Sequence, residues 1–411
     1  YEKRTDAALD SLRAESTVFS RCSAPAPWTG PSVASLMTGL FTARHRVNPH
    51  GARLPESQTT IAQLLKRNGW HTFGASFNPQ VSRTTGHHRG FDTWTEHTGD
   101  ATAYPDIEEM LARVRGWLVA EPRTPFFVYL QPMNVHGPYL TPEESRDDLL
   151  GRTPVAGFQY YDFIMNAVLK GGDRSRVTST YLQSLVEQYD TAIHYTLTKL
   201  AGFFDFLRKR GSYGRSLIIL TSDHGEELFE HGGFSHGFSL YEEVLHVPLY
   251  IKLPGQTQPR AVETPVQLMD LLPTLAELLD LELNFEPDGI SLRRYLVGDP
   301  QTSTAALRRT RLHQTSWESR CLGRAIVESG YKLIEIDRDW QSNESRTLLF
   351  DLSSDPDERH DMSAKRPLVV RRLEHRLDEL FEHYASLSSG EPENVRKQMD
   401  EERLRALGYV E

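Results

Sequence analysis

The sequence predicts an α/β protein in which helices sandwich a large, mainly parallel sheet, followed by a smaller C-terminal α+β subdomain. Two observations lead to this class. Short β-like runs alternate with helical patterns over about the first 300 residues, the order expected of a mainly parallel sheet covered on both faces. After about Leu296, several short strands follow one another and lead to an amphipathic helix, which indicates a small antiparallel sheet with a helix.

The α/β region is expected to begin with a helix over Ser32 to Leu36. Pro31 suits the first helical turn, where its missing N–H is not needed, so Thr29 lies at the positive end of this helix. The expected strands are His71–Ala75, Phe126–Gln131, Ser216–Thr221 and Val247–Leu253. The expected helices are Thr59–Asn68, Ile107–Val119, Tyr181–Arg210 and Asp270–Leu279.

The C-terminal subdomain is expected to contain three short strands and one amphipathic helix. The strands are Gly323–Glu328, Tyr331–Ile336 and Thr347–Leu352, and the helix is Leu368–Tyr384. We therefore divide the chain into an α/β domain (residues 1–300), the subdomain (residues 301–390) and a charged helical tail (residues 391–411).

Composition and charge exclude several classes of protein. The 411 residues carry a formal net charge of -10 and no long basic tract, so nucleic acid and anionic membranes are not expected partners. No apolar run approaches the roughly 18 residues that span a bilayer. Cys22 and Cys321 are the only cysteines, too few for a disulfide framework or a thiolate metal site, although one bridge between them stays open. The chain starts at Tyr1 without an initiator Met, so we expect a fragment or a processed form.

The densest group of candidate site residues follows the strand that ends at Thr221. Asp223 and His224 come directly after it, where open α/β sheets build ligand sites, and His231 and His236 lie close downstream. A carboxylate beside an imidazole binds divalent cations. The alternative is a loop whose polar side chains only cap turns and helix ends. The strand-end position and the neighbouring histidines favour a site.

His136 and Thr29 are two further candidates. His136 follows the strand Phe126–Gln131 in a proline-bounded loop, so two strand-end loops offer histidines to one cleft. Thr29 has two interpretations. It is either an ordinary N-cap of its helix or a nucleophile for a phosphoryl or sulfuryl centre, because the N–H donors and the dipole of a helix N-terminus favour an anion there.

Together, these segments resemble the sulfatase family of the alkaline phosphatase superfamily. TGPSVASLMTG (residues 29–39) is similar to the family's nucleophile motif, and NGWHTFGASFNP, HRGFDTW and NVHGPY are similar to its next landmarks. TSDHGEEL, HGFSLYEEVLHVPLYIK, MDLLPTLAELL and DGISL continue the likeness, and YKLIEI with LLFDLSSDPDERHDM resembles its C-terminal subdomain. The likeness covers nearly the whole chain in order. It implies the fold and a metal-dependent hydrolase or transferase of sulfate- or phosphate-type esters.

The resemblance assigns roles residue by residue. Thr29 takes the nucleophile position, and Asp223 with His224 takes the metal-ligand pair. His136 and His236 take positions that bind the transferred group or protonate the leaving oxygen. His224 replaces the Asn of many calcium-dependent sulfatases, so the implied divalent metal is zinc or manganese rather than calcium.

The departures from the family pattern point to phosphorus rather than sulfur. Hydrolytic sulfatases oxidise a Cys or Ser to formylglycine, which threonine cannot yield. Val33 stands at the motif's arginine, and Ser76–Pro79 lacks the Lys and His of that landmark, although Asn78 within it is expected to donate a hydrogen bond to the transferred group. Threonine with Asp-His is closer to phosphonate and phosphodiester hydrolases, and to threonine-using transferases of phosphoethanolamine and glycerol phosphate.

The resemblance also implies a first strand, ending in an Asp-Asp or Asp-Thr metal motif, just before Tyr1. Asp6 and Asp10 lie in the segment that follows such a strand and are expected to be charges on a helix surface. Without the strand, the sheet would lack a member and the metal a carboxylate pair, and we would expect an unstable or inactive molecule. The C-terminal LRALGYVE resembles the usual tail of bacterial members. The family resemblance as a whole favours a bacterial periplasmic or other extracytoplasmic location.

Three functions stay open at this point. The leading one is a hydrolase or transferase that uses Thr29 and prefers phosphodiester- or phosphonate-type esters of a small molecule, lipid or glycan. The second is a true sulfate-ester hydrolase with unmodified threonine. The third is a non-catalytic binding protein that keeps the fold.

Overall fold

The structure is a computed structural model that describes residues 3–97, 106–120, 125–142, 177–298, 309–317, 321–339, 342–388, 390 and 392–399. Its helices are α1 (Asp10–Ala14), α2 (Thr29–Thr38), α3 (Thr42–His45), α4 (Ile61–Arg67), α5 (Ile107–Ala120), α8 (Ser179–Lys209), α9 (Glu242–Leu245), α10 (Leu271–Leu278), α11 (Arg293–Val297) and α12 (Pro367–Ser386). Its strands are β1 (Thr17–Ser23), β2 (His71–Ser76), β3 (Thr93–Glu96), β4 (Phe126–Gln131), β5 (Ile218–Thr221), β6 (Glu227–Leu228), β7 (Phe234–Ser235), β8 (His246–Lys252), β9 (Arg260–Val262), β10 (Val266–Gln267), β11 (Arg311–Trp317), β12 (Cys321–Glu328), β13 (Tyr331–Arg338) and β14 (Arg346–Asp351). The predicted α/β class is confirmed.

The α/β domain contains two groups of hydrogen-bonded strands. One has the order β10-β1-β8-β5, with β9 also paired to β1, and the other has the order β3-β2-β4. Strand β8 is antiparallel to both β1 and β5, whereas every other pairing in these two groups is parallel. The sheet is therefore mixed, and its antiparallel member is one of the strands expected from the sequence.

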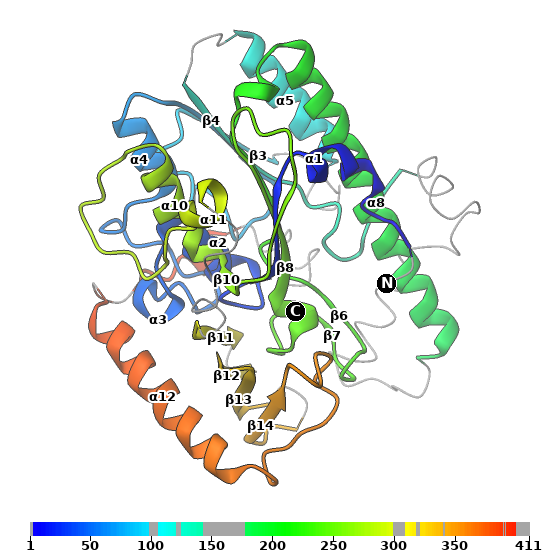
Figure 1. Ribbon diagram of the computed structural model, residues 1–411, viewed down its shortest axis with the longest axis vertical. Coiled ribbons are helices and arrows are strands. Elements are labelled where there is room, and N and C mark those ends of the chain that lie inside the picture. Colours follow the sequence, from blue (N-terminus) through cyan, green and yellow to red (C-terminus); the bar gives the residue numbers. More distant parts are fainter. Residues whose placement is uncertain are drawn as a thin grey trace.

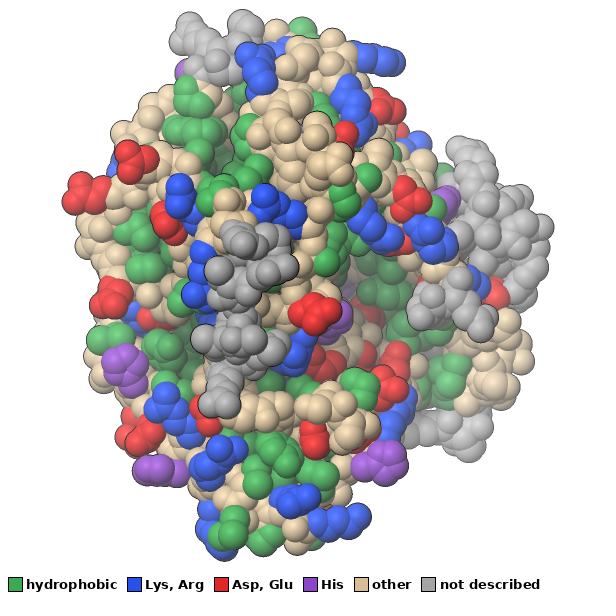
Figure 2. All heavy atoms as spheres, viewed as in Figure 1, with side chains coloured by type: hydrophobic (Ala, Val, Ile, Leu, Met, Phe, Trp, Pro, Cys, Tyr) green, Lys and Arg blue, Asp and Glu red, His purple; other side chains and the backbone are tan. Residues whose placement is uncertain are grey.

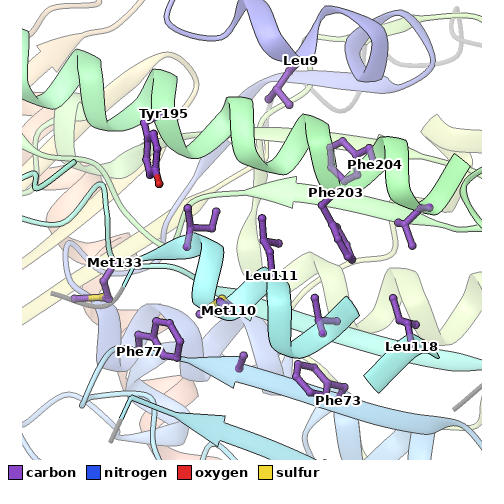
Figure 3. Packing of buried hydrophobic residues seen from close by; sticks show 14 of the residues in the cluster. Leu9, Phe73, Phe77, Met110, Leu111, Leu118, Met133, Tyr195, Phe203 and Phe204 are labelled. Carbon is purple, nitrogen blue, oxygen red and sulfur yellow. The ribbon is translucent and has the colours of Figure 1, made fainter. Parts of the chain in front are cut away.

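Helices cover both faces of these strands, with α5 and α8 on one side and α4 and α10 on the other (Figure 1). The strands alternate accordingly, because successive side chains of a strand point to opposite faces. In β4, Phe126, Val128 and Leu130 pack towards α5 and α8, while Phe127 packs towards α4 and α10. Figure 3 shows the first of these cores, in which α8 contributes Phe203 and Phe204 and α5 contributes Met110 and Leu111.

A cavity of about 1240 Å³ separates the two groups of strands. Among the described residues, β4 pairs only with β2 and β5 pairs only with β8, so each strand turns an unpaired edge towards the cavity. Every residue of β4 and β5 is only partly buried, although both strands lie between helical layers. The cavity is lined by apolar side chains that include Met110, Leu111, Val128, Leu130, Leu200, Phe203, Ile218 and Leu220.

The C-terminal part forms an antiparallel sheet in the order β11-β12-β13-β14. Helix α12 covers one face through Leu373, Leu377 and Phe381 (Figure 1). The other face packs on Leu240 and Leu245, which belong to the α/β part of the chain. Strand β11 was not expected from the sequence, and it lies at the edge of this sheet beside the α/β domain.

The helices, the N-terminal acidic residues, Cys22 and the C-terminal tail can each be compared with what the sequence predicts. None of the described helices is long and apolar enough to cross a bilayer. Asp6 and Asp10 are exposed or half-buried and pair with Arg13 and Arg4, so they are surface charges as expected. Cys22 is a buried free thiol. Most of the predicted tail lies outside the described residues. Within it, the Val395 N–H donates to the Gly51 carbonyl at 2.8 Å.

Candidate functional site

Thr29 is the first residue of α2, and its side chain does not cap the helix. Trp28 takes the N-cap position in an extended conformation, and no side chain caps the helix there. The Thr29 hydroxyl instead lies 3.2 Å from His224 Nε2 and accepts a hydrogen bond of 3.3 Å from Asn78 Nδ2. Thr29 is only 1% exposed. The N-cap interpretation is therefore wrong, and the hydroxyl faces other candidate site residues.

Asp223 and His224 follow β5 directly, at the end of the strand nearest Thr29. The Ser32 hydroxyl donates to the Asp223 carbonyl at 2.6 Å, which ties the first turn of α2 to this loop. His224 Nδ1 pairs with the Gly225 carbonyl at 2.8 Å, so the proton sits on Nδ1 and Nε2 presents its lone pair to Thr29. Burial lowers the pKa of His224, so the ring is neutral near pH 7.

His136 and His236 complete a cluster of three imidazoles. The ring of His236 lies 5.0 Å from that of His136 and 4.3 Å from that of His224. Burial and the neighbouring His236 lower the pKa of His136 to about 4. His236 Nδ1 is 2.9 Å from Glu226 Oε1, and both side chains are about 5% exposed. Burial acts to raise the pKa of Glu226, but His236, His136 and His224 together leave this pKa lowered.

The structure brings together six of the seven polar residues singled out in the sequence. Thr29, Asn78, His136, Asp223, His224 and His236 lie in one cluster. His231 lies apart from it. Its Nδ1 is 2.6 Å from Glu243 Oε1, and its ring stacks on Tyr241 with 3.7 Å between ring centroids. Its role is therefore a structural contact rather than a place in the cluster.

Sequence reasoning missed Glu226, Gln131 and Tyr189. Gln131 ends β4, and its Nε2 donates to Asp223 Oδ2 at 3.2 Å, which brings the carboxyl ends of β4 and β5 together. Tyr189 of α8 lines the same cavity as His136, and burial followed by the nearby Glu226 raises its pKa. Their positions in the sequence could have indicated Gln131 and Glu226 as site residues. Gln131 ends a predicted strand, and Glu226 follows His224 by two residues.

The donors for a divalent metal are only partly in place. His224 Nε2 lies 3.7 Å from Asp223 Oδ2 and 3.2 Å from the Thr29 hydroxyl. This nitrogen and oxygen set suits zinc or manganese better than calcium. Within the described ranges, however, no three His, Cys, Asp or Glu side chains gather as metal ligands. The described residues therefore offer donors of a suitable kind for a metal, but too few of them to hold one.

The cluster lies on the wall of the large cavity, at the carboxyl ends of β4 and β5. Figure 2 shows acidic and histidine side chains around a hollow near the middle of the molecule's face. A buried hydroxyl at a helix N-terminus, facing the neutral imidazole of His224 at the end of an α/β sheet, is an arrangement that fits an ester hydrolase.

Comparison with known proteins gives the family. The sulfatase family model matches residues 1–281, and a second model, the C-terminal part of N-sulphoglucosamine sulphohydrolase, matches residues 229–383. The chain belongs to the sulfatase family and is an ester hydrolase. It is 26% identical over 430 residues to arylsulfatase K of Bos taurus, which covers 91% of this chain and 77% of that protein. It is 23% identical to a sulfatase of Formosa agariphila, over 85% of this chain and 76% of that protein.

Solved structures share the fold. A phosphonate monoester hydrolase of Agrobacterium radiobacter superimposes with a TM-score of 0.74 at 20% identity, covering 93% of this chain and 92% of that one. A protein solved with its substrate D-glucosamine-2-N,6-O-disulfate superimposes with a TM-score of 0.68 at 18% identity, covering 95% and 94% of the two chains. Phosphorus and sulfur chemistry therefore both occur among proteins of this fold.

Proposed function

We propose that this sulfatase-family hydrolase cleaves phosphodiester- or phosphonate-type esters with Thr29 as its nucleophile. The observation that carries the proposal is the Thr29 hydroxyl, which contacts His224 and Asn78 instead of capping its own helix. The substrate class is an ester of a small molecule, or one linked to a lipid or a glycan.

In the first step, the Thr29 oxygen attacks phosphorus in line with the leaving oxygen. His224 Nε2 accepts the hydroxyl proton while the bond from oxygen to phosphorus forms and the bond to the leaving oxygen breaks. The positive end of α2 stabilises the anionic group in the transition state. Water then cleaves the threonyl ester, and an acceptor alcohol in place of water would complete a transfer instead.

We assign protonation of the leaving oxygen to His236, whose ring centroid lies 4.3 Å from that of His224. The Glu226 carboxylate pairs with its Nδ1 and so orients the ring, and we assign Nε2 as the nitrogen that acts on the leaving oxygen. His136 Nδ1 pairs with the Gly137 carbonyl at 2.8 Å, and its pKa of about 4 keeps it neutral. We therefore assign His136 to binding the transferred group, together with Asn78.

Two observations favour phosphorus over sulfur. Val33, where the resemblance implies an arginine, is 1% exposed and packs among Met37, Val81 and Trp94, so it offers no cation to a sulfate group. The phosphonate monoester hydrolase from Agrobacterium radiobacter is also a close structural match. The arylsulfatase relatives keep a second function open, in which unmodified Thr29 cleaves a sulfate ester.

Sulfatase-family enzymes generally use a divalent metal. We propose Asp223 and His224 as two of its ligands, with zinc or manganese preferred to calcium. A metal bound there would use the lone pair of His224 Nε2. Its positive charge, rather than this nitrogen, would then favour loss of the Thr29 hydroxyl proton.

The test compares Thr29→Ala and Thr29→Ser with the unaltered chain on nitrophenyl phosphodiester, phosphonate and sulfate esters. Thr29→Ala should lower kcat by about 10³-fold or more, and Thr29→Ser should keep part of the activity, because only Ser retains a hydroxyl. Intact mass after rapid quenching should show a phosphoryl adduct on the unaltered chain and none on Thr29→Ala. Metal content measured on the same samples identifies the ion.

Thr38→Ala is the matched control. Thr38 lies at the other end of α2, and its hydroxyl donates to the Ala34 carbonyl at 2.7 Å, away from the cluster. It should leave kcat within a few-fold of the unaltered chain. Full activity of Thr29→Ala would refute the threonine mechanism. A faster rate on the sulfate ester would favour the sulfatase alternative, and no turnover of any ester by the unaltered chain would favour a binding protein.

A further inference from the structure

We propose that Thr315, on strand β11 of the C-terminal sheet, is a positioning residue for His236. The inference rests on the function proposed above, because there His236 protonates the leaving oxygen. Thr315 belongs to the C-terminal part of the chain, 79 residues after His236. It reaches the site through the backbone that follows His236 and touches none of the reacting groups.

The contact that carries the inference runs through Gly237. The Thr315 hydroxyl donates to the Gly237 carbonyl at 2.6 Å, and the Gly237 N–H donates to the Pro27 carbonyl at 2.9 Å. Both polar backbone groups of the residue next to His236 are therefore held. Gly237 has φ of 90°, in the left-handed region that favours glycine. Because glycine has no side chain, the backbone at this position is held by its two hydrogen bonds.

Strand β11 also contacts the segment that leads into Thr29. His313 Nδ1 pairs with the Ala24 carbonyl at 2.8 Å, and the Gln314 N–H donates to the Pro25 carbonyl at 3.1 Å. Three consecutive residues of β11 thus contact both the approach to the nucleophile and the loop of the proton donor. Strand β11 therefore holds the segment before Thr29 and the loop of His236 next to each other.

Loss of the Thr315 hydroxyl should free the loop of His236. Thr315 is 1% exposed, so in Thr315→Val the Gly237 carbonyl stays buried without its partner and the loop shifts to recover one. A misplaced proton donor slows the reaction most when the leaving group is a poor one, because a good leaving group departs without a proton. This dependence distinguishes positioning from a general loss of folded protein.

The experiment measures kcat/KM for a nitrophenyl ester and for the matching phenyl ester, which has the poorer leaving group. Thr315→Val should lower kcat/KM about 10-fold or more on the phenyl ester and only about 2-fold on the nitrophenyl ester. Thr315→Ser keeps the hydroxyl and should restore both rates. Thr310→Val is the matched control, since the Thr310 hydroxyl binds Glu328 at 2.8 Å within the C-terminal sheet and should affect neither rate. If Thr315→Val does not fold, Thr315→Ala replaces it in the same comparison.

The double variant separates this inference from the proposed function. In a His236→Ala background, Thr315→Val should cause no further loss on the phenyl ester, because the group that it positions is missing. An equal loss on both esters, or the same loss in both backgrounds, would make Thr315 merely structural and overturn the inference. If His236→Ala itself shows no leaving-group dependence, the proposed role of His236 fails, and the role of Thr315 fails with it.

Discussion

At the scale of single residues, the buried His45 contacts α2, the helix that begins with Thr29. His45 is fully buried, with Nε2 2.9 Å from the Ser35 hydroxyl and Nδ1 accepting the Val47 N–H at 3.0 Å. Ser35 belongs to α2, so the neutral His45 ring stabilises the helix that carries Thr29. Burial, with the nearby His87, lowers the pKa of His45 to about 3.

This pKa predicts acid sensitivity of the fold. The unfolded chain takes up a proton on His45 below about pH 6.5, whereas the native state does so only near pH 3, so the free energy of unfolding falls as the pH drops through this window. His45→Asn should reduce that slope by about 1.4 kcal/mol per pH unit. Urea unfolding at several pH values tests it. His375→Asn, at an exposed histidine, is the control, and parallel curves for His45→Asn and the unaltered chain would contradict the prediction.

The same scale shows what the sequence predicts about the site. Asp223, His224 and His136 were found because each follows an apolar strand, and open α/β sheets place ligand sites there. Glu226 and Gln131 were missed because their function depends on pairing. Gln131 meets Asp223 across 92 positions of sequence, and Glu226 meets His236 only after the loop folds back. Nothing in local pattern encodes such contacts.

At the scale of elements, Lys332 of β13 joins the C-terminal sheet to α9. Its Nζ lies 2.9 Å from Glu242 Oε1 and 2.8 Å from Glu358 Oε1, and Lys332 is fully buried. Lys332→Met should therefore leave the buried Glu358 carboxylate and the partly buried Glu242 carboxylate without this cation, and lower the free energy of unfolding by about 3–5 kcal/mol. Denaturant unfolding measures this loss of stability.

Lys365→Met, at an exposed lysine, is the control and should change the free energy of unfolding little. Glu358→Gln added to Lys332→Met should recover part of the loss. A cost no larger than that of Lys365→Met would refute the role of Lys332.

The elements themselves were predictable where their apolar pattern is strong. Phe126–Gln131 and the long helix α8 lie within a residue or two of their predicted bounds, because each buries a clear stripe or run. Strand β1 escaped prediction because Ser20 and Arg21 interrupt its apolar pattern, yet it pairs with three other strands. Strand β11 was not predicted because it lacks an alternation of apolar and polar residues. Its polar residues Arg311, His313 and Thr315 are buried instead of exposed.

At the scale of the whole molecule, the cavity between β4 and β5 divides the central sheet. Both strands end at the site, since Gln131 and Asp223 meet there, so they run in the same direction on either side of the cavity. Unpaired backbone groups inside an apolar cavity are costly, and a further strand is the occupant that would satisfy both edges at once. Lys3 to Asp6 line this cavity, and Lys3 Nζ binds Asp190, next to Tyr189 at the site end. A strand that ended beside Asp223 would thus meet the chain at Lys3.

We predict that an apolar strand added to the N-terminal side of this chain would fill the cavity in parallel with β4 and β5. Pairing and burial of its side chains should raise the midpoint of thermal unfolding by roughly 5 °C or more. Hydrogen exchange should become slower at the edge amides of β4 and β5, and activity should rise as Thr29 and Asp223 are fixed in place. The chain with an added N-terminal extension that forms an apolar strand is compared with the same extension bearing two prolines, which cannot pair on both edges. Equal exchange in the two extended chains would rule the strand out, and exchange slowed only in a dimer would assign it to a second copy.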